Sequence, residues 1–200
     1  MKMLIFPFLL LLVVSGCSGR KGKLLDFPNL RQAHDYSCGP GAVQAVMAYY
    51  GDDFRESELI DLMKTSKDKG TYIKDIVKFL HYRGLSATIK HEMTTHELFS
   101  YIDENIPVIV LIQAWGNEND FKNRYKECWD DGHFVVVVGY SDKNILISDP
   151  AIYNTGYIPI SEFIDRWHDF DEGDTKTYQL GIPVFGKKPK FNREELIRIE

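Results

Sequence analysis

The chain has 200 residues, and its 24 Lys and Arg against 29 Asp and Glu give a formal net charge of −5 at pH 7. Nucleic-acid binding is not expected of such a chain, because it depends on cationic side chains that neutralise phosphates. The contents of 44% hydrophobic and 13% aromatic residues can fill the core of one domain and exclude disordered or low-complexity classes.

Residues 1–16 are typical of a secretory signal: Lys2 is followed by an apolar run at 3–14 that is too short to span a bilayer comfortably. The segment ends in VSGC at 14–17, which resembles the lipobox of bacterial lipoproteins. That resemblance implies that Cys17 is lipidated and becomes the mature N-terminus. An ordinary cleaved signal that happens to contain a cysteine is the alternative.

Residues 17–23 are then the lipidated cysteine and a short polar tether. Two or more acyl chains anchor a protein stably, whereas the mature body, with a charge of 23 − 29 = −6, offers no polybasic patch to assist. We expect a membrane-anchored lipoprotein that faces the periplasm or the cell exterior. Ser18 favours the outer membrane if the host is Gram-negative.

Residues 24–186 are expected to form the domain, and residues 187–200 a charged, exposed tail with a short helix. The first half of the domain reads as helical, and strands begin after Gly84. The predicted helices are 38–50, buried and ended by Gly51, then 57–64, 71–82, 94–104 with a capping box at Thr94 and Glu97, and 161–167. The predicted strands are 85–90, 108–115, the hairpin 133–140 and 145–148, and 178–185, edge-like because of Pro183. Helices followed by antiparallel strands predict an α+β domain.

Cys38 stands at the start of the buried helix, followed by Gly39 and Pro40. The helix dipole and the unpaired amides of a first turn favour a thiolate, so this cysteine has the position of a nucleophile. A nucleophile of this kind needs a base, and the base needs an orienting acceptor.

His133 and Asp149 meet that description. His133 opens one strand of the predicted hairpin and Asp149 closes the other, so a hairpin turning at 141–144 places them side by side. Gln32, six residues before Cys38, can donate its side-chain amide to a developing oxyanion together with the backbone N–H of Cys38.

These residues resemble a known family. Gln32 to Pro40 (QAHDYSCGP), then Gly132 to Val137 (GHFVVV) and Ser148-Asp149-Pro150, are similar to the double-glycine leader, or bacteriocin-processing, peptidases, a branch of the papain-like cysteine proteases. The resemblance implies a papain-like fold, Cys38 as nucleophile, His133 as general base and acid, Asp149 orienting it, Gln32 as oxyanion donor, a peptide or protein substrate and no cofactor.

The resemblance also has departures. Family members that mature bacteriocins are usually the cytoplasmic N-terminal domain of an ABC exporter, whereas this chain carries a secretory signal, so an exporter or secretion system is a candidate partner only by resemblance. Cleavage after a Gly-Gly leader does not follow. Two alternatives keep the fold: an inactive peptidase-like domain that binds a peptide or partner, and a transglutaminase-like acyl transferase.

Several residues near the predicted site have structural alternatives. Trp115 and Trp129 either wall a substrate groove, with Gly39 and Gly132 beside the catalytic residues, or pin a long loop to the body. Cys128 is expected to pack in that loop, with pairing to Cys38 or between molecules as alternatives. His91 and His96 are five residues apart, whereas a zinc helix needs four, so no metal site is predicted.

Overall fold

The computed structural model describes residues 21–116, 118–119, 123–172, 174–196 and 198–199. The predicted signal segment and Cys17 lie outside these residues. Within them, no helix is both long and apolar enough to cross a membrane.

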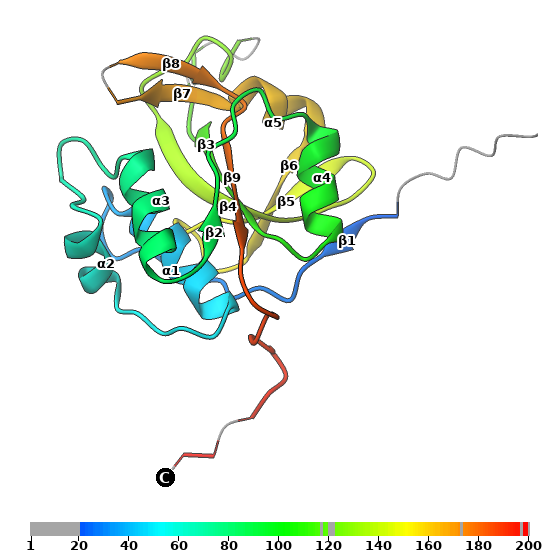
Figure 1. Cartoon of the computed structure of the whole chain (residues 1–200). Coiled ribbons are helices and arrows are strands. Elements are labelled where there is room, and N and C mark those ends of the chain that lie inside the picture. Colours follow the sequence, from blue (N-terminus) through cyan, green and yellow to red (C-terminus); the bar gives the residue numbers. More distant parts are fainter. Residues whose placement is uncertain (1–20, 117, 120–122, 173, 197, 200) are drawn as a thin grey trace, which may run out of the picture.

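Three helices lie together at one side of a large sheet (Figure 1). They are α1 (Cys38–Tyr49), α2 (Glu56–Leu62) and α3 (Ile73–Tyr82), close to the predicted ranges. Helix α1 is buried almost all round and packs against the sheet, as its apolar sequence predicts. It ends before Gly51, whose φ of +87° is the left-handed conformation that glycine adopts after a helix.

The sheet has the order β2-β9-β3-β4-β5-β6, with β1 beside the end of β4, and all its pairs are antiparallel. The β3–β4 pair forms its buried centre because both sequences are nearly continuous apolar runs. The strands are β1 (Lys23–Leu24), β2 (Ser86–Ala87), β3 (Val108–Gln113), β4 (Gly132–Tyr140), β5 (Asn144–Ser148), β6 (Thr155–Pro159) and β9 (Gly181–Phe185). This arrangement confirms the α+β prediction.

Two further elements cover the sheet, and a hairpin stands at one end of it (Figure 1). Helices α4 (Thr95–Asp103) and α5 (Ile160–Arg166) match the predicted short helices. The hairpin of β7 (His168–Asp171) and β8 (Thr175–Tyr178), together with β6, was not predicted from the sequence.

Two predictions about the C-terminal part were wrong. Strand β9 is not an edge strand, because β2 pairs with it on the side away from β3. Val184 donates its N–H to Pro107 beside β3, so the nitrogen of Pro183 points to the opposite side, where β2 is only two residues long. The described part of the tail contains no helix; instead Lys190 and Phe191 donate backbone N–H groups to the Tyr49 carbonyl at 3.0 and 3.2 Å.

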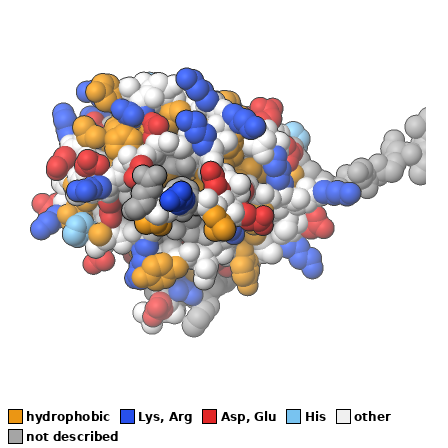
Figure 2. Space-filling model, turned by 90° about the horizontal axis from the view of Figure 1, so that it is seen from below, with side chains coloured by type: hydrophobic (Ala, Val, Ile, Leu, Met, Phe, Trp, Pro, Cys, Tyr) orange, Lys and Arg blue, Asp and Glu red, His pale blue; other side chains and the backbone are white. Residues whose placement is uncertain are grey.

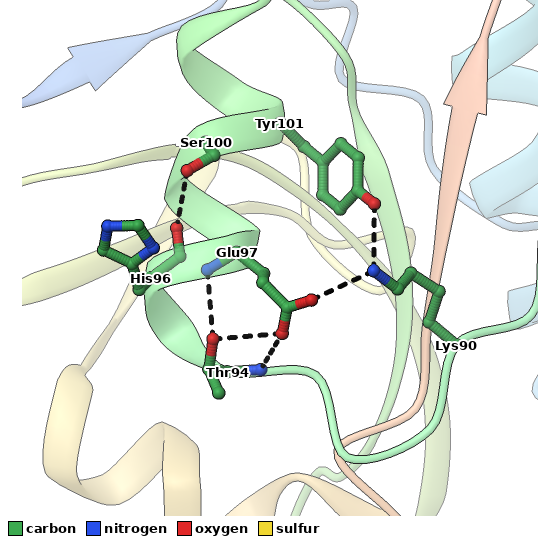
Figure 3. Close-up of polar contacts among 6 residues, drawn as sticks. All are labelled: Lys90, Thr94, His96, Glu97, Ser100 and Tyr101. Atoms are coloured by element: carbon green, nitrogen blue, oxygen red, sulfur yellow. Dashed lines mark hydrogen bonds and ion pairs between the residues drawn. The ribbon is translucent and has the colours of Figure 1, made fainter.

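The capping box predicted for α4 is present (Figure 3). Thr94 Oγ1 accepts from the Glu97 amide at 3.2 Å, and Glu97 Oε2 accepts from the Thr94 amide at 2.9 Å. Lys90 donates to the other carboxylate oxygen at 3.0 Å and to the Tyr101 hydroxyl at 3.2 Å. This network ties the segment before the helix to its first two turns.

Thr94→Ala is expected to lower the free energy of unfolding by about 1 kcal/mol, because it removes the oxygen that caps the helix. Urea denaturation measures the change. Thr95→Ala is the control, because Thr95 is the first helical residue and makes no capping bond. Equal effects of the two substitutions would contradict the capping role.

The face in Figure 2 carries cationic and anionic side chains interspersed over its described residues. This mixed distribution accords with the modest net charge of −5.

Candidate active site

Cys38 is the first residue of α1, and in the described part of the chain no side chain caps the start of this helix. Ser37 precedes it, but its hydroxyl donates to the His34 carbonyl at 2.7 Å and makes no capping bond to the helix. Pro40 has no N–H to satisfy. Among the described residues, the amides of Cys38 and Gly39 donate to no backbone carbonyl outside the helix, as is usual for the first turn of a helix.

His133 and Asp149 meet across the β4–β5 pair. His133 Nε2 lies 2.7 Å from Asp149 Oδ1, and the imidazole is 3% exposed. The same carboxylate oxygen accepts the Ala151 N–H at 2.8 Å, which fixes the acid just after the end of β5. Because Nε2 faces Asp149, Nδ1 is the ring nitrogen left for Cys38.

The electrostatics join the three side chains. Burial alone would lower the pKa of His133, but hydrogen bonds to Asp149 and to Cys38 outweigh it and raise this pKa to about 9. For Asp149, burial raises the pKa, and the bond and charge of His133 outweigh it, so the pKa lies below its ordinary value. The arrangement therefore favours the protonated imidazolium form of His133.

Gln32 lies beside this group. Its backbone N–H donates to the Pro150 carbonyl at 2.8 Å, so the residue after Asp149 holds it in place. Its side-chain amide donates to the His34 carbonyl at 2.7 Å, and its Oε1 is buried with no hydrogen-bond partner among the described residues. An amide nitrogen carries two hydrogens, so one remains to bind an oxyanion.

A glycine permits this packing. A Cβ at Gly41 would lie 2.8 Å from Pro150 Cβ and 3.4 Å from Gln32 Cβ. The start of α1 can thus approach both the Gln32 segment and the Asp149 segment closely.

Two hollows flank the site. One, of about 220 Å³, lies beside Cys38 and Gly132; the other, of about 760 Å³, includes Gln32, Trp115 and Tyr153 in its walls.

The two tryptophans differ in what they contact. Trp115 is 56% exposed, lines the larger hollow and lies against the His133 ring with a centroid distance of 5.3 Å. Trp129 packs instead against His168, Phe170 and Tyr178 of the β7–β8 hairpin. Of the two interpretations left open for Trp129, this packing favours the one in which the side chain pins its loop to the hairpin.

Both glycines named from the sequence lie against residues that line the smaller hollow. A Cβ at Gly39 would lie 2.7 Å from the Thr71 hydroxyl, and one at Gly132 would lie 2.0 Å from Asp169 Oδ2. Thr71 and Asp169 were missed in the sequence. The Asp-Glu-Gly-Asp run at 171–174 was the available signal, because such a turn between short alternating segments predicts a hairpin.

Gly132→Ala is expected to lower the free energy of unfolding by about 1–3 kcal/mol, because the new methyl group overlaps the Asp169 carboxylate. Urea denaturation measures it. In Gly156→Ala, the control, the methyl group meets the flexible end of Ile152 at 3.2 Å and the Ile147 carbonyl oxygen at an ordinary 3.9 Å. If Asp169→Ala, made together with Gly132→Ala, recovers none of the loss, the proposed overlap is not its cause.

Cys128 packs in its loop. Both Cys38 and Cys128 are free thiols, and Cys128 Sγ donates to Asp131 Oδ2 at 3.3 Å. Burial raises the pKa of the Cys128 thiol. Cys128 is thus a protonated reference thiol within the same chain. No cluster of three or more His, Cys, Asp or Glu side chains able to hold a metal occurs among the described residues.

Solved structures define the class of this domain. A C39-like peptidase structure from Bacillus anthracis matches 86% of this chain and all of its own, at a TM-score of 0.64 and 16% identity. The peptidase domain of Streptococcus ComA, a bifunctional ABC transporter, matches 79% of this chain and 97% of its own, at a TM-score of 0.56 and 21% identity. A double-glycine protease from an AMS/PCAT transporter, solved with the leader peptide, matches 80% of this chain and 91% of its own. The TM-score is 0.54 and the sequence identity is 20%. The fold is that of the papain-like cysteine proteases.

The sequence comparisons then give the family. The model described as "Peptidase_C39 like family" matches residues 24–174, so the chain belongs to that family. The pediocin PA-1 transport/processing ATP-binding protein PedD of Pediococcus acidilactici is 26% identical over 137 residues. An uncharacterized protein of Methanothermobacter marburgensis is 29% identical over 133 residues, which is 66% of this chain and 78% of that protein. The match covers 68% of this chain but only 17% of PedD, so the chain spans less than a fifth of that relative.

Proposed function

We propose that the protein is a cysteine peptidase in which Cys38 is the nucleophile, His133 the general base and acid, Asp149 the orienting carboxylate and Gln32 an oxyanion donor. The observation that carries this proposal is the single imidazole shared by Asp149, at 2.7 Å, and Cys38. A buried histidine with a carboxylate on one nitrogen and a thiol on the other is the arrangement that nucleophilic catalysis requires.

The reaction follows from these positions. The Cys38 thiolate attacks the scissile carbonyl carbon, and the oxyanion that forms accepts hydrogen bonds from the Cys38 amide and the Gln32 side chain. The C–N bond then breaks as the His133 imidazolium gives its proton to the leaving amine. Water, deprotonated by the now neutral His133, attacks the thioester, and the C–S bond breaks to release the carboxylic acid and to restore the Cys38 thiolate beside the protonated His133.

The substrate is a peptide or protein. The smaller hollow borders Cys38, and the larger one borders Trp115, which lies against the His133 ring, so both offer an extended chain a binding surface next to the catalytic pair. The relatives named above include peptidase domains of transporters and a protease solved with a leader peptide, which supports a peptide substrate and an exporter as a candidate partner.

We also propose that a lipid on Cys17 anchors the protein to a membrane, on the side facing the periplasm or cell exterior. The tether leads into β1, which pairs with the end of β4 at Gly139 and Tyr140. His133 lies at the other end of the same strand, seven residues or about 23 Å away. The anchor thus joins the domain far from the catalytic group, which keeps the site open to substrates away from the membrane.

A cleavage assay tests the peptidase proposal. The full chain in detergent micelles is incubated with a mixture of unstructured peptides in H₂¹⁸O, and new C-termini are identified by mass. We expect cleavage products carrying ¹⁸O, lost in Cys38→Ala and kept in Cys128→Ala. Added hydroxylamine separates the acyl transferase alternative: a transferase gives hydroxamates in place of hydrolysed products. Binding without any cleavage would support the inactive alternative.

The anchor is tested in cells expressing the full chain. Metabolic palmitate labelling is expected in the wild type and not in Cys17→Ser, and globomycin should leave an unprocessed, heavier form. A mature form of unchanged mass under globomycin would overturn the anchor.

A further inference from the structure

The smaller hollow beside Cys38 contains charged groups that the proposed chemistry does not use. Its volume is about 220 Å³. Liquid water occupies about 30 Å³ per molecule, so the hollow has room for about seven waters or one long side chain. Cys38 and Gly132 lie at the hollow, together with the apolar side chains of Ile73, Leu111 and Phe134. A side chain that enters it therefore belongs to a residue close to the scissile bond.

Asp169 of β7 is the most confined of the charged groups. The residue is 8% exposed, and the 2.0 Å between its Oδ2 and a Cβ built at Gly132 shows how closely it lies against the residue before His133. Burial raises the pKa of the carboxyl to about 6, bonds from the Phe170 backbone and Gln113 oppose the rise, and the charge of Asp130 adds to it. Among the described residues, the groups acting on this pKa include no cation.

The rest of the lining leaves an excess of negative charge. Among the described residues of the lining, four carboxylates, Asp169, Asp171, Glu172 and Asp174, face a single lysine, Lys69. Glu172 is already held by Lys74 at 2.5 Å. A buried, ionised carboxylate lowers the stability of the folded state unless a cation pairs with it. In this protein, such a cation can enter from the open side of the hollow.

The position of His133 indicates which part of a substrate reaches the hollow. His133 must protonate the leaving amine, and its ring lies against Trp115, which lines the larger hollow. The leaving part of the peptide is thereby directed to the larger hollow. The acyl part then extends over Cys38 and Gly132 into the smaller one.

We propose that the smaller hollow is a specificity subsite for a lysine or arginine side chain on the acyl side of the scissile bond, with Asp169 binding its charge. This inference rests on the proposed peptidase function. It makes the enzyme selective for peptides with a cationic residue within two positions before the cleaved bond. The apolar part of the lining contacts the methylene stem of that side chain.

Covalent probes test the subsite. Peptidyl chloromethyl ketones alkylate a thiolate with loss of chloride, and they place their residues on the acyl side. Two pairs are used, with lysine or norleucine either at the residue bearing the ketone or at the one before it. The second-order rate of Cys38 labelling is measured by mass on the full chain. For one of the two positions, we expect the lysine probe to react at least about 10-fold faster than its norleucine partner, as befits a close buried charge pair.

Substitutions then assign the effect to Asp169. In Asp169→Asn the ratio of the lysine rate to the norleucine rate is expected to fall to about 1. In Asp165→Asn, a matched loss of one exposed charge on α5, it is expected to keep its wild-type value. The ratio compares two probes on one protein, so a partial loss of folded protein does not alter it.

The outcomes separate this inference from the proposed function. Equal rates for lysine and norleucine at both positions, on a Cys38 that remains reactive, overturn the subsite and leave the peptidase proposal standing. A ratio that survives in Asp169→Asn overturns the role of Asp169. A Cys38 that reacts with no probe overturns both proposals.

Discussion

Asp149→Asn is expected to lower the pKa of His133 from about 9 toward its ordinary value near 6.5. Burial alone disfavours the imidazolium, and the bond to Asp149 comes first among the groups that oppose it. A neutral amide keeps the shape of the carboxylate but not its charge. NMR titration of the His133 imidazole in the full chain measures the change.

Cleavage should fall in the same variant by about 100-fold or more, because the imidazole loses both its orientation and its proton. Asp142→Asn is the control, since Asp142 lies in the exposed turn between β4 and β5 and makes no contact with His133. A His133 pKa that stays near 9 in Asp149→Asn would show that the carboxylate does not hold the proton on this ring.

Asp169→Asn is expected to raise the free energy of unfolding by about 1–3 kcal/mol at pH 7.5, even though it removes a proposed substrate contact. The pKa of Asp169 is about 6 in the fold, against 3.8 for the ordinary group. Because the folded pKa is the higher one, the ionised carboxylate costs the native state stability. That cost is absent below about pH 4, grows as pH rises to 6 and is complete above it.

Urea denaturation of the wild type and of Asp169→Asn between pH 4 and 8 measures this difference. The gain in the variant should shrink as pH falls through 6 and vanish near 4. Asp165→Asn, which removes an exposed carboxylate, should show a difference near zero at every pH. A wild type that is more stable than Asp169→Asn at pH 7.5 would mean that the carboxylate stabilises the fold and would contradict its assignment as a costly, functional charge.

Much of this fold could be predicted because patterns within short stretches of the sequence determine its helices, strands and turns. The apolar run after Cys38 and the buried runs at 108–113 and 133–140 have no other stable place than the interior of one domain. The hairpin turn at 141–144 brings His133 to Asp149, since antiparallel register is set by the turn between two strands. The helix cap at Thr94 is local as well.

What could not be predicted depends on contacts between distant segments. Asp169 reaches Gly132 only because the β7–β8 hairpin folds over the start of β4, and no short-range pattern reports that docking. The sequence allowed Trp129 either to wall a groove or to anchor its loop. Its contact with Phe170 of the same hairpin favours the anchor. Pro183 suggested an edge strand, because nothing in the sequence shows that the strand predicted at 85–90, observed as the two-residue β2, pairs with β9.

The central claim is that Cys38 and His133 form a thiolate–imidazolium pair. The most direct measurement is the rate of iodoacetamide labelling of Cys38 against pH in the full chain and in His133→Ala, with Cys128 read in the same digests as the reference thiol. An ordinary thiol has a pKa of about 8.5 and is less than about 1% ionised at pH 6. We predict that Cys38 still reacts at pH 6 in the wild type and slows about 100-fold in His133→Ala, while Cys128 reacts only at alkaline pH in both. A Cys38 that follows Cys128, or that is indifferent to His133, would contradict the account.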